Sequence, residues 1–109
     1  MIKWERVSEL RSEVGDDAFD EIVALFLEET DEVVARISDQ CDQRAIEADL
    51  HFLKGAALNL GFSDFANLCQ DGERAAARGH AVVDPEALQG LYLLTKAAFV
   101  AGLARLNAA

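Results

Sequence analysis

Apolar residues recur every three or four positions along most of the chain, and only a few short stretches interrupt this spacing. Such a period places apolar side chains on one side of an α-helix. The pattern predicts helices over residues of about 3–13, 16–38, 43–60 and 63–78, and a last helix that begins at 84–85. No stretch of alternating β-branched residues typical of strands is present, so the fold class indicated is all-α.

The interruptions contain residues that end or begin helices. Gly15 and Gly61 each follow a periodic segment, and glycine readily adopts the left-handed conformation at a helix end. Ser63 is suited to cap the fourth helix, and Pro85 is suited to open the last one. Since the connections are short, consecutive helices are expected to pack antiparallel. We therefore predict an antiparallel up-down four-helix bundle with a short N-terminal covering helix.

Each long helix carries an apolar seam that is expected to face the core. The seam of the second helix comprises Phe19, Ile22, Phe26, Thr30, Val33 and Ile37. That of the third helix comprises Ile46, Leu50, Leu53, Ala57 and Leu60. The fourth helix is expected to bury Phe65, Leu68, Cys69, Gly72, Ala75 and Ala76. In the last helix the seam comprises Leu88, Leu91, Thr95, Ala98, Gly102 and Leu106.

Length and charge narrow the class of protein. With 109 residues the chain fits one domain, residues 1–109. The net charge of -10 repels phosphate backbones and anionic lipid, so neither nucleic acid nor membrane is an expected partner.

The N-terminus lacks an apolar signal core, which favours a cytoplasmic protein. Cys41 and Cys69 have no further ligand at zinc spacing, so we expect reduced thiols and no metal site. We also expect no cofactor in the chain.

One histidine stands apart from the core pattern. On the third helix His51 points about 140° away from the centre of the seam and is expected to face water. Residues three, four and seven positions away share this exposed face, which carries Arg44, Glu47, Lys54, Gly55 and Leu58. Exposed histidines are commonly ordinary surface residues, and a glycine within a helix is sometimes an accident of packing. Both readings remain open on position alone.

The combination of three neighbours indicates phosphoryl transfer chemistry. A phosphoryl carrier built on imidazole needs an exposed nitrogen nucleophile, a nearby cation and clearance for its partner. His51, Lys54 and Gly55 supply these in that order. Glycine within a helix costs about 1 kcal/mol relative to alanine, so its presence beside the histidine indicates a benefit from the missing side chain.

The fourth helix supplies two further candidates. In a hairpin that turns at Gly61, residues whose numbers sum to about 124 lie at equal height, which pairs Glu73 with His51 and Gln70 with Lys54. Glu73 lies close enough to the core boundary to accept a hydrogen bond from one imidazole nitrogen and orient the ring. Gln70 is a candidate neighbour of the phosphoryl group. An ordinary solvated glutamate remains the alternative for Glu73.

Over residues 7–79 the chain resembles a histidine-containing phosphotransfer (HPt) domain of bacterial two-component phosphorelays. The segment from His51 to Ala57, closed by Leu60-Gly61, is similar to the family motif His-x-Leu-Lys-Gly-(Ser/Ala)-(Ser/Ala). Leu68-Cys69 followed by Glu73 and the segment Phe26-Leu27-Glu28-Glu29-Thr30 resemble its other signatures. Two positions depart from the family pattern: Gly72 replaces a usual leucine, and Asp49 replaces a usual small residue.

The resemblance implies that His51 accepts a phosphoryl group from a receiver-domain aspartate or a kinase and passes it to another receiver. It implies no ATP site and no kinase activity in the chain, with magnesium held by the receiver. The expected partners are a response-regulator receiver domain and a sensor or hybrid histidine kinase. The partner-binding residues expected on this face are Arg44, Glu47, Ala48 and Leu58.

Two other functions compete with this interpretation. A non-catalytic binding module could keep the histidine and sequester a receiver or scaffold a kinase. An enzyme using His51 as a general base is disfavoured, because no paired nucleophile, oxyanion donors or metal set accompany it. Met1 and a complete bundle favour a free-standing relay protein over the end of a larger kinase, and we expect a monomer.

Overall fold

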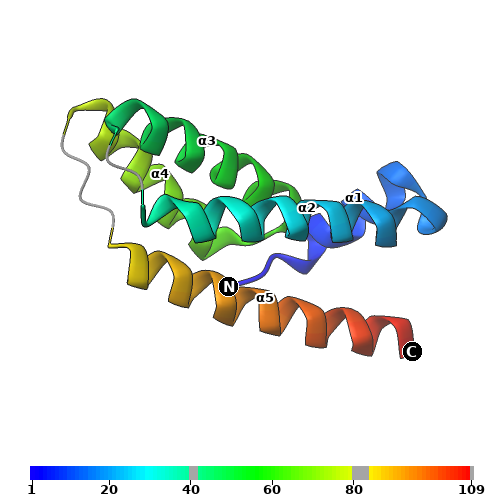
Figure 1. Ribbon diagram of the computed structural model, residues 1–109. Helices are drawn as coiled ribbons and strands as arrows, with labels where there is room; N and C mark the ends of the chain where they lie inside the picture. The colour runs from blue at the N-terminus through cyan, green and yellow to red at the C-terminus, as the bar shows by residue number, and fades with distance from the viewer. Residues whose placement is uncertain (40–41, 80–83, 109) are drawn as a thin grey trace.

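The computed structural model describes residues 1–39, 42–79 and 84–108, and five α-helices account for nearly all of them (Figure 1). These helices are α1 (Trp4–Val14), α2 (Asp16–Ile37), α3 (Gln43–Leu60), α4 (Ser63–Ala77) and α5 (Pro85–Ala108). In the described ranges the extended backbone is limited to one isolated bridge between Ile2 and Phe62. The all-α prediction is confirmed, and the helix bounds differ from those expected by a residue at most.

The arrangement is an elongated antiparallel bundle of 46 × 23 × 20 Å. Helices α3 and α4 form a closely packed hairpin, α2 lies against α3, and α5 lies against α2 and α4 (Figure 1). The short α1 packs on α2 and α3, as expected of a covering helix. All five residues of the predicted α3 seam are buried, with Leu50 and Leu53 at 0% exposure. Burial of a leucine side chain stabilises a fold by about 1.5–3 kcal/mol, so α3 anchors the core.

The first residues of the chain are held against the turn between α3 and α4. The amide of Lys3 donates a hydrogen bond to the Gly61 carbonyl oxygen over 2.7 Å. Gly61 has a φ of 76°, and a Cβ there would lie 2.5 Å from the Lys3 carbonyl oxygen. Only glycine fits both the left-handed conformation and this close approach. The Gly61 turn therefore sets the register of the α3–α4 hairpin, as the sequence predicted.

The predicted capping role of Ser63 is wrong. Ser63 is the first residue of α4, and Phe62 occupies the N-cap position without a side-chain hydrogen bond. The Ser63 hydroxyl instead donates to the carbonyl oxygen of Met1 over 3.1 Å. Its side chain is therefore used to fix the N-terminal segment, which a local capping pattern does not reveal.

The predicted seam of α5 is also partly wrong. Leu88, Thr95 and Gly102 are buried as expected, but Leu91 and Ala98 are only half-buried and Leu106 is 46% exposed. The remaining buried positions are Tyr92 and Phe99. Both predicted and observed seams are apolar, because α5 carries apolar residues on almost every side. Tertiary contacts therefore decide which side faces the core.

One of these contacts comes from the N-terminal helix. The Trp4 ring stacks on the Phe99 ring with centroids 5.8 Å apart, and a Cβ at Gly102 would overlap the Trp4 ring. Phe62 also packs against Phe99, with the two rings in an edge-to-face arrangement and their centroids 5.1 Å apart. An aromatic cluster from three segments thus fixes the rotation of α5 about its axis.

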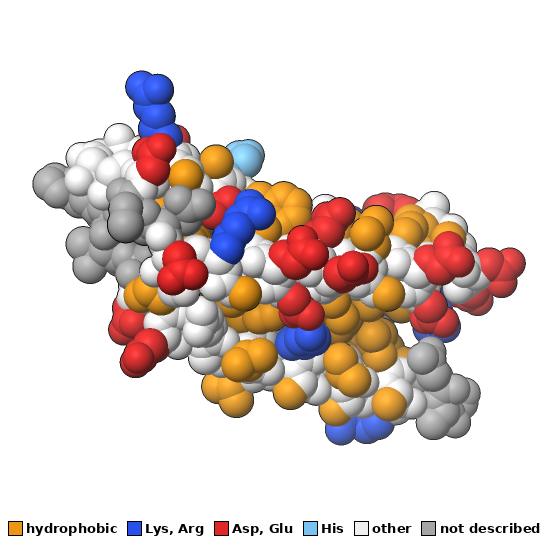
Figure 2. Space-filling view, viewed as in Figure 1, with side chains coloured by type: hydrophobic (Ala, Val, Ile, Leu, Met, Phe, Trp, Pro, Cys, Tyr) orange, Lys and Arg blue, Asp and Glu red, His pale blue; other side chains and the backbone are white. Residues whose placement is uncertain are grey.

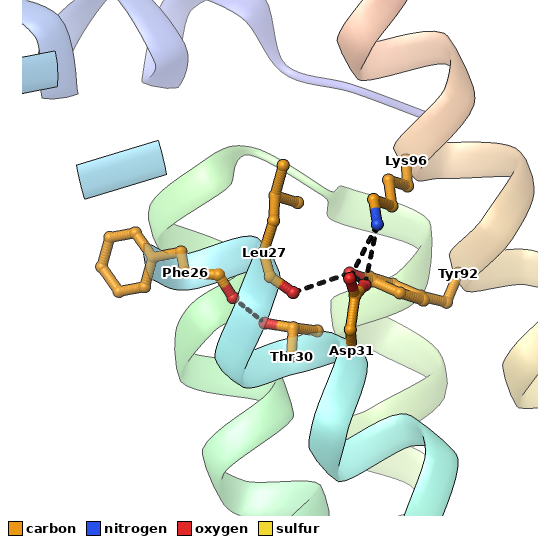
Figure 3. Close-up of polar contacts among 6 residues, drawn as sticks. All are labelled: Phe26, Leu27, Thr30, Asp31, Tyr92 and Lys96. Carbon is orange, nitrogen blue, oxygen red and sulfur yellow. Dashed lines mark hydrogen bonds and ion pairs between the residues drawn. The ribbon is translucent and has the colours of Figure 1, made fainter. Parts of the chain in front are cut away.

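A polar cluster centred on Asp31 attaches α5 to α2 (Figure 3). The Tyr92 hydroxyl donates to Asp31 Oδ1 over 2.5 Å, and Lys96 Nζ lies 2.8 Å from Asp31 Oδ2. Burial and the Asp31 carboxylate raise the pKa of Tyr92, so its hydroxyl remains protonated and continues to donate. Hydrogen bonds to a charged acceptor are the stronger kind, and these span 61 and 65 residues of sequence.

The seam of α2 is close to the one predicted. Phe19, Thr30, Val33 and Ile37 are buried as expected, whereas Ile22 and Phe26 are half-buried. Val23 and Val34 are buried in addition. In α4, Phe65, Cys69 and Ala76 are buried, and Leu68, Gly72 and Ala75 are half-buried.

Helix α5 is long and strongly apolar. Its segment Pro85–Leu106 is long and apolar enough, by length and composition alone, to cross a membrane. Core helices of soluble proteins pass the same test, and α5 packs on α2 and α4. Only 28% of its most apolar 18-residue window is buried within the fold.

Candidate functional site

His51 projects from the middle of α3 on the side opposite the core. Its side chain is 69% exposed, while the neighbouring Leu50 and Leu53 are completely buried. A helix rotates by about 100° per residue, so a buried position and the next residue in sequence point in clearly different directions. The predicted exposure of His51 is confirmed.

Glu73 on α4 holds one side of the imidazole ring. His51 Nδ1 lies 2.8 Å from Glu73 Oε1. This agrees with the prediction that the two residues lie at equal height in the α3–α4 hairpin. An ionised carboxylate can only accept, so Nδ1 carries the proton and donates it. In the neutral ring the lone pair is then on Nε2, and Nε2 makes no hydrogen bond with any residue of the described ranges. The ring is oriented and its free nitrogen faces solvent.

Lys54 approaches the second oxygen of the same carboxylate. Its Nζ lies 3.0 Å from Glu73 Oε2, and both side chains are mostly buried, at 24% and 20% exposure. The two groups form an ion pair, and the ammonium is the partner that the structure gives to the buried Oε2. Glu73 therefore links the imidazole to the ammonium.

The charge state of Glu73 follows from these neighbours. Burial by itself would raise the pKa of this carboxyl group. Interaction with Lys54, and then with His51, outweighs burial, so the pKa of Glu73 lies below its ordinary value. The group is ionised at neutral pH and acts only as an acceptor.

Gly55 leaves open space beside the histidine. A Cβ at this position would meet no atom of a neighbouring element within 4 Å, and its φ is not in the left-handed region. The fold therefore does not require glycine here, unlike at Gly61. Packing within the fold therefore does not explain this glycine, and it leaves the surface beside His51 open.

The surface around His51 contains the other candidate residues. A shallow hollow beside the ring is lined by Arg44, Glu47, Ala48, His51 and Glu73. The side chain of Leu58, two turns along α3, is 57% exposed. Gln70 is half-buried one turn before Glu73, and in the described part of the chain it forms no hydrogen bond with His51 or Lys54. The hairpin brings Lys54 to Glu73 rather than to Gln70.

Two features near the site were missed by sequence reasoning. Asp49 is buried and accepts from Arg36 of α2, whose Nη2 lies 2.8 Å from Asp49 Oδ1. An acidic residue beside the α3 seam, where the family has a small one, was the available signal. Phe52, next to His51, is 38% exposed and adds a second large apolar side chain near this face.

The remaining expectations concern the second histidine, the two cysteines and metal binding. His80 and Cys41 lie outside the described ranges, while Cys69 is a free, buried thiol whose pKa is raised to about 12 by burial. Across the residues that the structure describes, no group of three or more His, Cys, Asp or Glu side chains could hold a metal ion.

Comparison with known proteins assigns the family. The sequence model of the Hpt domain matches residues 21–109, which is most of the chain and includes the whole site. The chain therefore belongs to the Hpt domain family, whose members carry phosphoryl groups in two-component signalling without a kinase activity of their own. Searches against curated proteins and against solved structures returned no match.

Proposed function

We propose that the chain is a phosphorelay intermediate that carries a phosphoryl group on Nε2 of His51. The group comes from a receiver-domain aspartate or a kinase and goes to the aspartate of another response-regulator receiver. One observation carries this proposal: the exposed imidazole has its Nδ1 fixed by an ionised, mostly buried Glu73, so that Nε2 is the free nucleophile.

The transfer step follows from this geometry. The Nε2 lone pair attacks the phosphorus of the receiver's aspartyl phosphate, the P–O bond to the aspartyl group breaks, and the carboxylate leaves. The Nδ1 proton stays on the ring, which becomes cationic when the N–P bond forms. Glu73 stabilises that cation by accepting from Nδ1. Magnesium held by the receiver would supply positive charge for the phosphoryl oxygens. Transfer to the second receiver reverses the same step.

Lys54 supplies positive charge from the chain itself. Its ammonium lies 3.0 Å from Glu73 Oε2, one carboxylate away from the imidazole. A lysine stem is flexible, so the ammonium can turn from Glu73 toward the phosphoryl oxygens once the group is on His51. In this second position the cation lies beside the negative charge of the phosphoryl group.

The rival function is a binding module that retains the histidine without using it. To separate the two, the chain is incubated with phosphorylated receiver domains from the source organism, and then with a second, unphosphorylated receiver. We expect acid-labile, alkali-stable phosphate on the chain, followed by its appearance on the second receiver. Stable complex formation without incorporated phosphate would support the binding module instead.

Gly55 provides a test of partner clearance. Gly55→Gln is expected to slow transfer from a phosphorylated receiver, because the new side chain occupies the open space beside His51. Thermal stability is expected to be unchanged or higher, since glycine within a helix costs up to about 1 kcal/mol relative to better helix formers. Phosphotransfer reactions sampled at fixed times measure the rate of transfer, and thermal unfolding measures the stability.

Gly55→Ala is the matched control, because it removes glycine while adding one methyl group. It is expected to be more stable than the parent and to transfer almost as fast. Transfer by Gly55→Gln at the rate of the parent would show that the partner does not need this space.

A further inference from the structure

The outward side of α5 is an uncharged apolar surface. Between Glu86 and Arg105 the exposed residues, which we call the outer face of α5, are Ala87, Gly90, Leu93, Leu94, Ala97, Val100, Ala101 and Ala104. The largest of them, Leu93, Leu94 and Val100, are 62%, 65% and 50% exposed. Hydrophobic side chains gather along α5 in Figure 2, whereas acidic ones gather over α1 and α2.

This surface is unusual for a chain with this charge. There are 20 acidic residues among 109, yet none lies on the outer face of α5 over about 28 Å of helix, at 1.5 Å per residue. Between Glu86 and Arg105 the charged residue of the helix is Lys96, which is half-buried and paired with Asp31. Single exposed apolar residues are ordinary, but a continuous apolar face indicates an interface.

We propose that the outer face of α5 binds the same face of a second copy of the chain, in an antiparallel two-fold dimer. In such a pair, residues whose numbers sum to about 190 lie opposite each other. Leu93 of one copy then lies against Ala97 of the other, and Val100 lies against Gly90. A Cβ at Gly90 would meet no atom within 4 Å in the single chain, so this space is open to a partner. At these two levels a large side chain meets a small one, which is the complementarity that close helix packing requires.

The charges at the ends of the face select the direction of pairing. Glu86 lies in the first turn of α5 and Arg105 in the last. An antiparallel pair brings Glu86 of each copy beside Arg105 of the other, whereas a parallel pair would bring Glu86 beside Glu86. Antiparallel helices also place opposite ends of their dipoles together. The surface is therefore complementary to itself in one orientation.

The dimer leaves the candidate phosphotransfer site accessible. The backbone of α5 lies close to those of α2 and α4 and not to that of α3, which carries His51. The proposal thus does not depend on the proposed function, and it replaces the expectation of a monomer. A lipid surface is a weaker choice of partner, because an acidic chain is repelled by anionic lipid and this face carries no basic cluster.

Sedimentation equilibrium on the whole chain, from micromolar to sub-millimolar concentration, tests the proposal. The apparent mass is expected to rise toward twice the chain mass of 11.9 kDa. Leu93→Asp is expected to remain at the chain mass, with unchanged helical content by circular dichroism. The matched control is Leu25→Asp, which adds the same charge at a 54% exposed leucine of α2 and is expected to dimerise like the parent.

A charge exchange tests the antiparallel register. Glu86→Arg and Arg105→Glu are each expected to weaken dimerisation severalfold, and the double variant is expected to restore it. The proposal is overturned if the parent keeps the chain mass throughout, if Leu93→Asp still dimerises, or if the double variant is no tighter than either single one. Binding of a monomeric parent to phosphatidylcholine vesicles would also overturn it and assign the face to lipid.

Discussion

His51→Gln is expected to abolish incorporation of phosphate from a phosphorylated receiver. Glutamine places an amide where the imidazole stood, and an amide nitrogen has no available lone pair with which to attack phosphorus. The fold is expected to persist, because the His51 side chain is 69% exposed and contributes no apolar burial to the core. Acid-labile phosphate on the chain is the measurement, and circular dichroism follows helical content.

The control for this experiment is the second histidine of the chain. His80→Gln removes the only other imidazole, at a position outside the described residues, and is expected to leave labelling intact. Labelling that survives His51→Gln, or that disappears in His80→Gln, would assign the phosphoryl group to another residue.

The geometry around His51 was predictable because it depends on local rules. The spacing of apolar residues in α3 predicted that His51 faces solvent. The short turn at Gly61 predicted which residues of α4 lie level with His51. These two together predicted the contact with Glu73, which the structure shows at 2.8 Å. The Lys54 contact with the same carboxylate was not predicted, because a long side chain reaches a residue about one turn away from its own level.

The rotation of α5 was not predictable in the same way. Its sequence is apolar on almost every side, so a seam can be drawn through several sets of residues. The Trp4 ring and the Asp31 cluster, both distant in sequence, choose among them. The same uniform composition explains the exposed outer face, because residues that do not face the core remain apolar.

Electrostatic pairing across the bundle escaped prediction for a related reason. The Asp49 carboxylate is buried because Arg36 reaches it from α2, and neither residue alone indicates the other. A lone acidic residue beside a seam normally predicts exposure. Only the relative placement of α2 and α3 shows why it is tolerated.

Leu58→Asp is expected to weaken receiver binding by more than about tenfold, or roughly 1.4 kcal/mol. The Leu58 side chain is 57% exposed, two turns from His51, and lines a hollow that is also lined by Lys3, which precedes α1, and by Arg6 of α1. The chain has a net charge of -10 and a receiver's active pocket is acidic, so long-range attraction contributes little. Apolar contact must then supply much of the affinity, and an exposed leucine beside the reactive group is the available anchor.

Titration calorimetry with the receiver measures this effect, and Leu25→Asp again separates position from charge. Leu25 is 54% exposed on α2, so its replacement adds the same negative charge to an exposed leucine of another helix. If repulsion alone weakened binding, both variants would bind equally poorly, whereas a specific contact at Leu58 predicts that Leu25→Asp binds nearly as tightly as the parent. If the dissociation constant of Leu58→Asp stays within about twofold of the parent value, the receiver binds another surface of the bundle. A twofold change corresponds to only about 0.4 kcal/mol. A carboxylate buried in the interface would weaken binding by more than that.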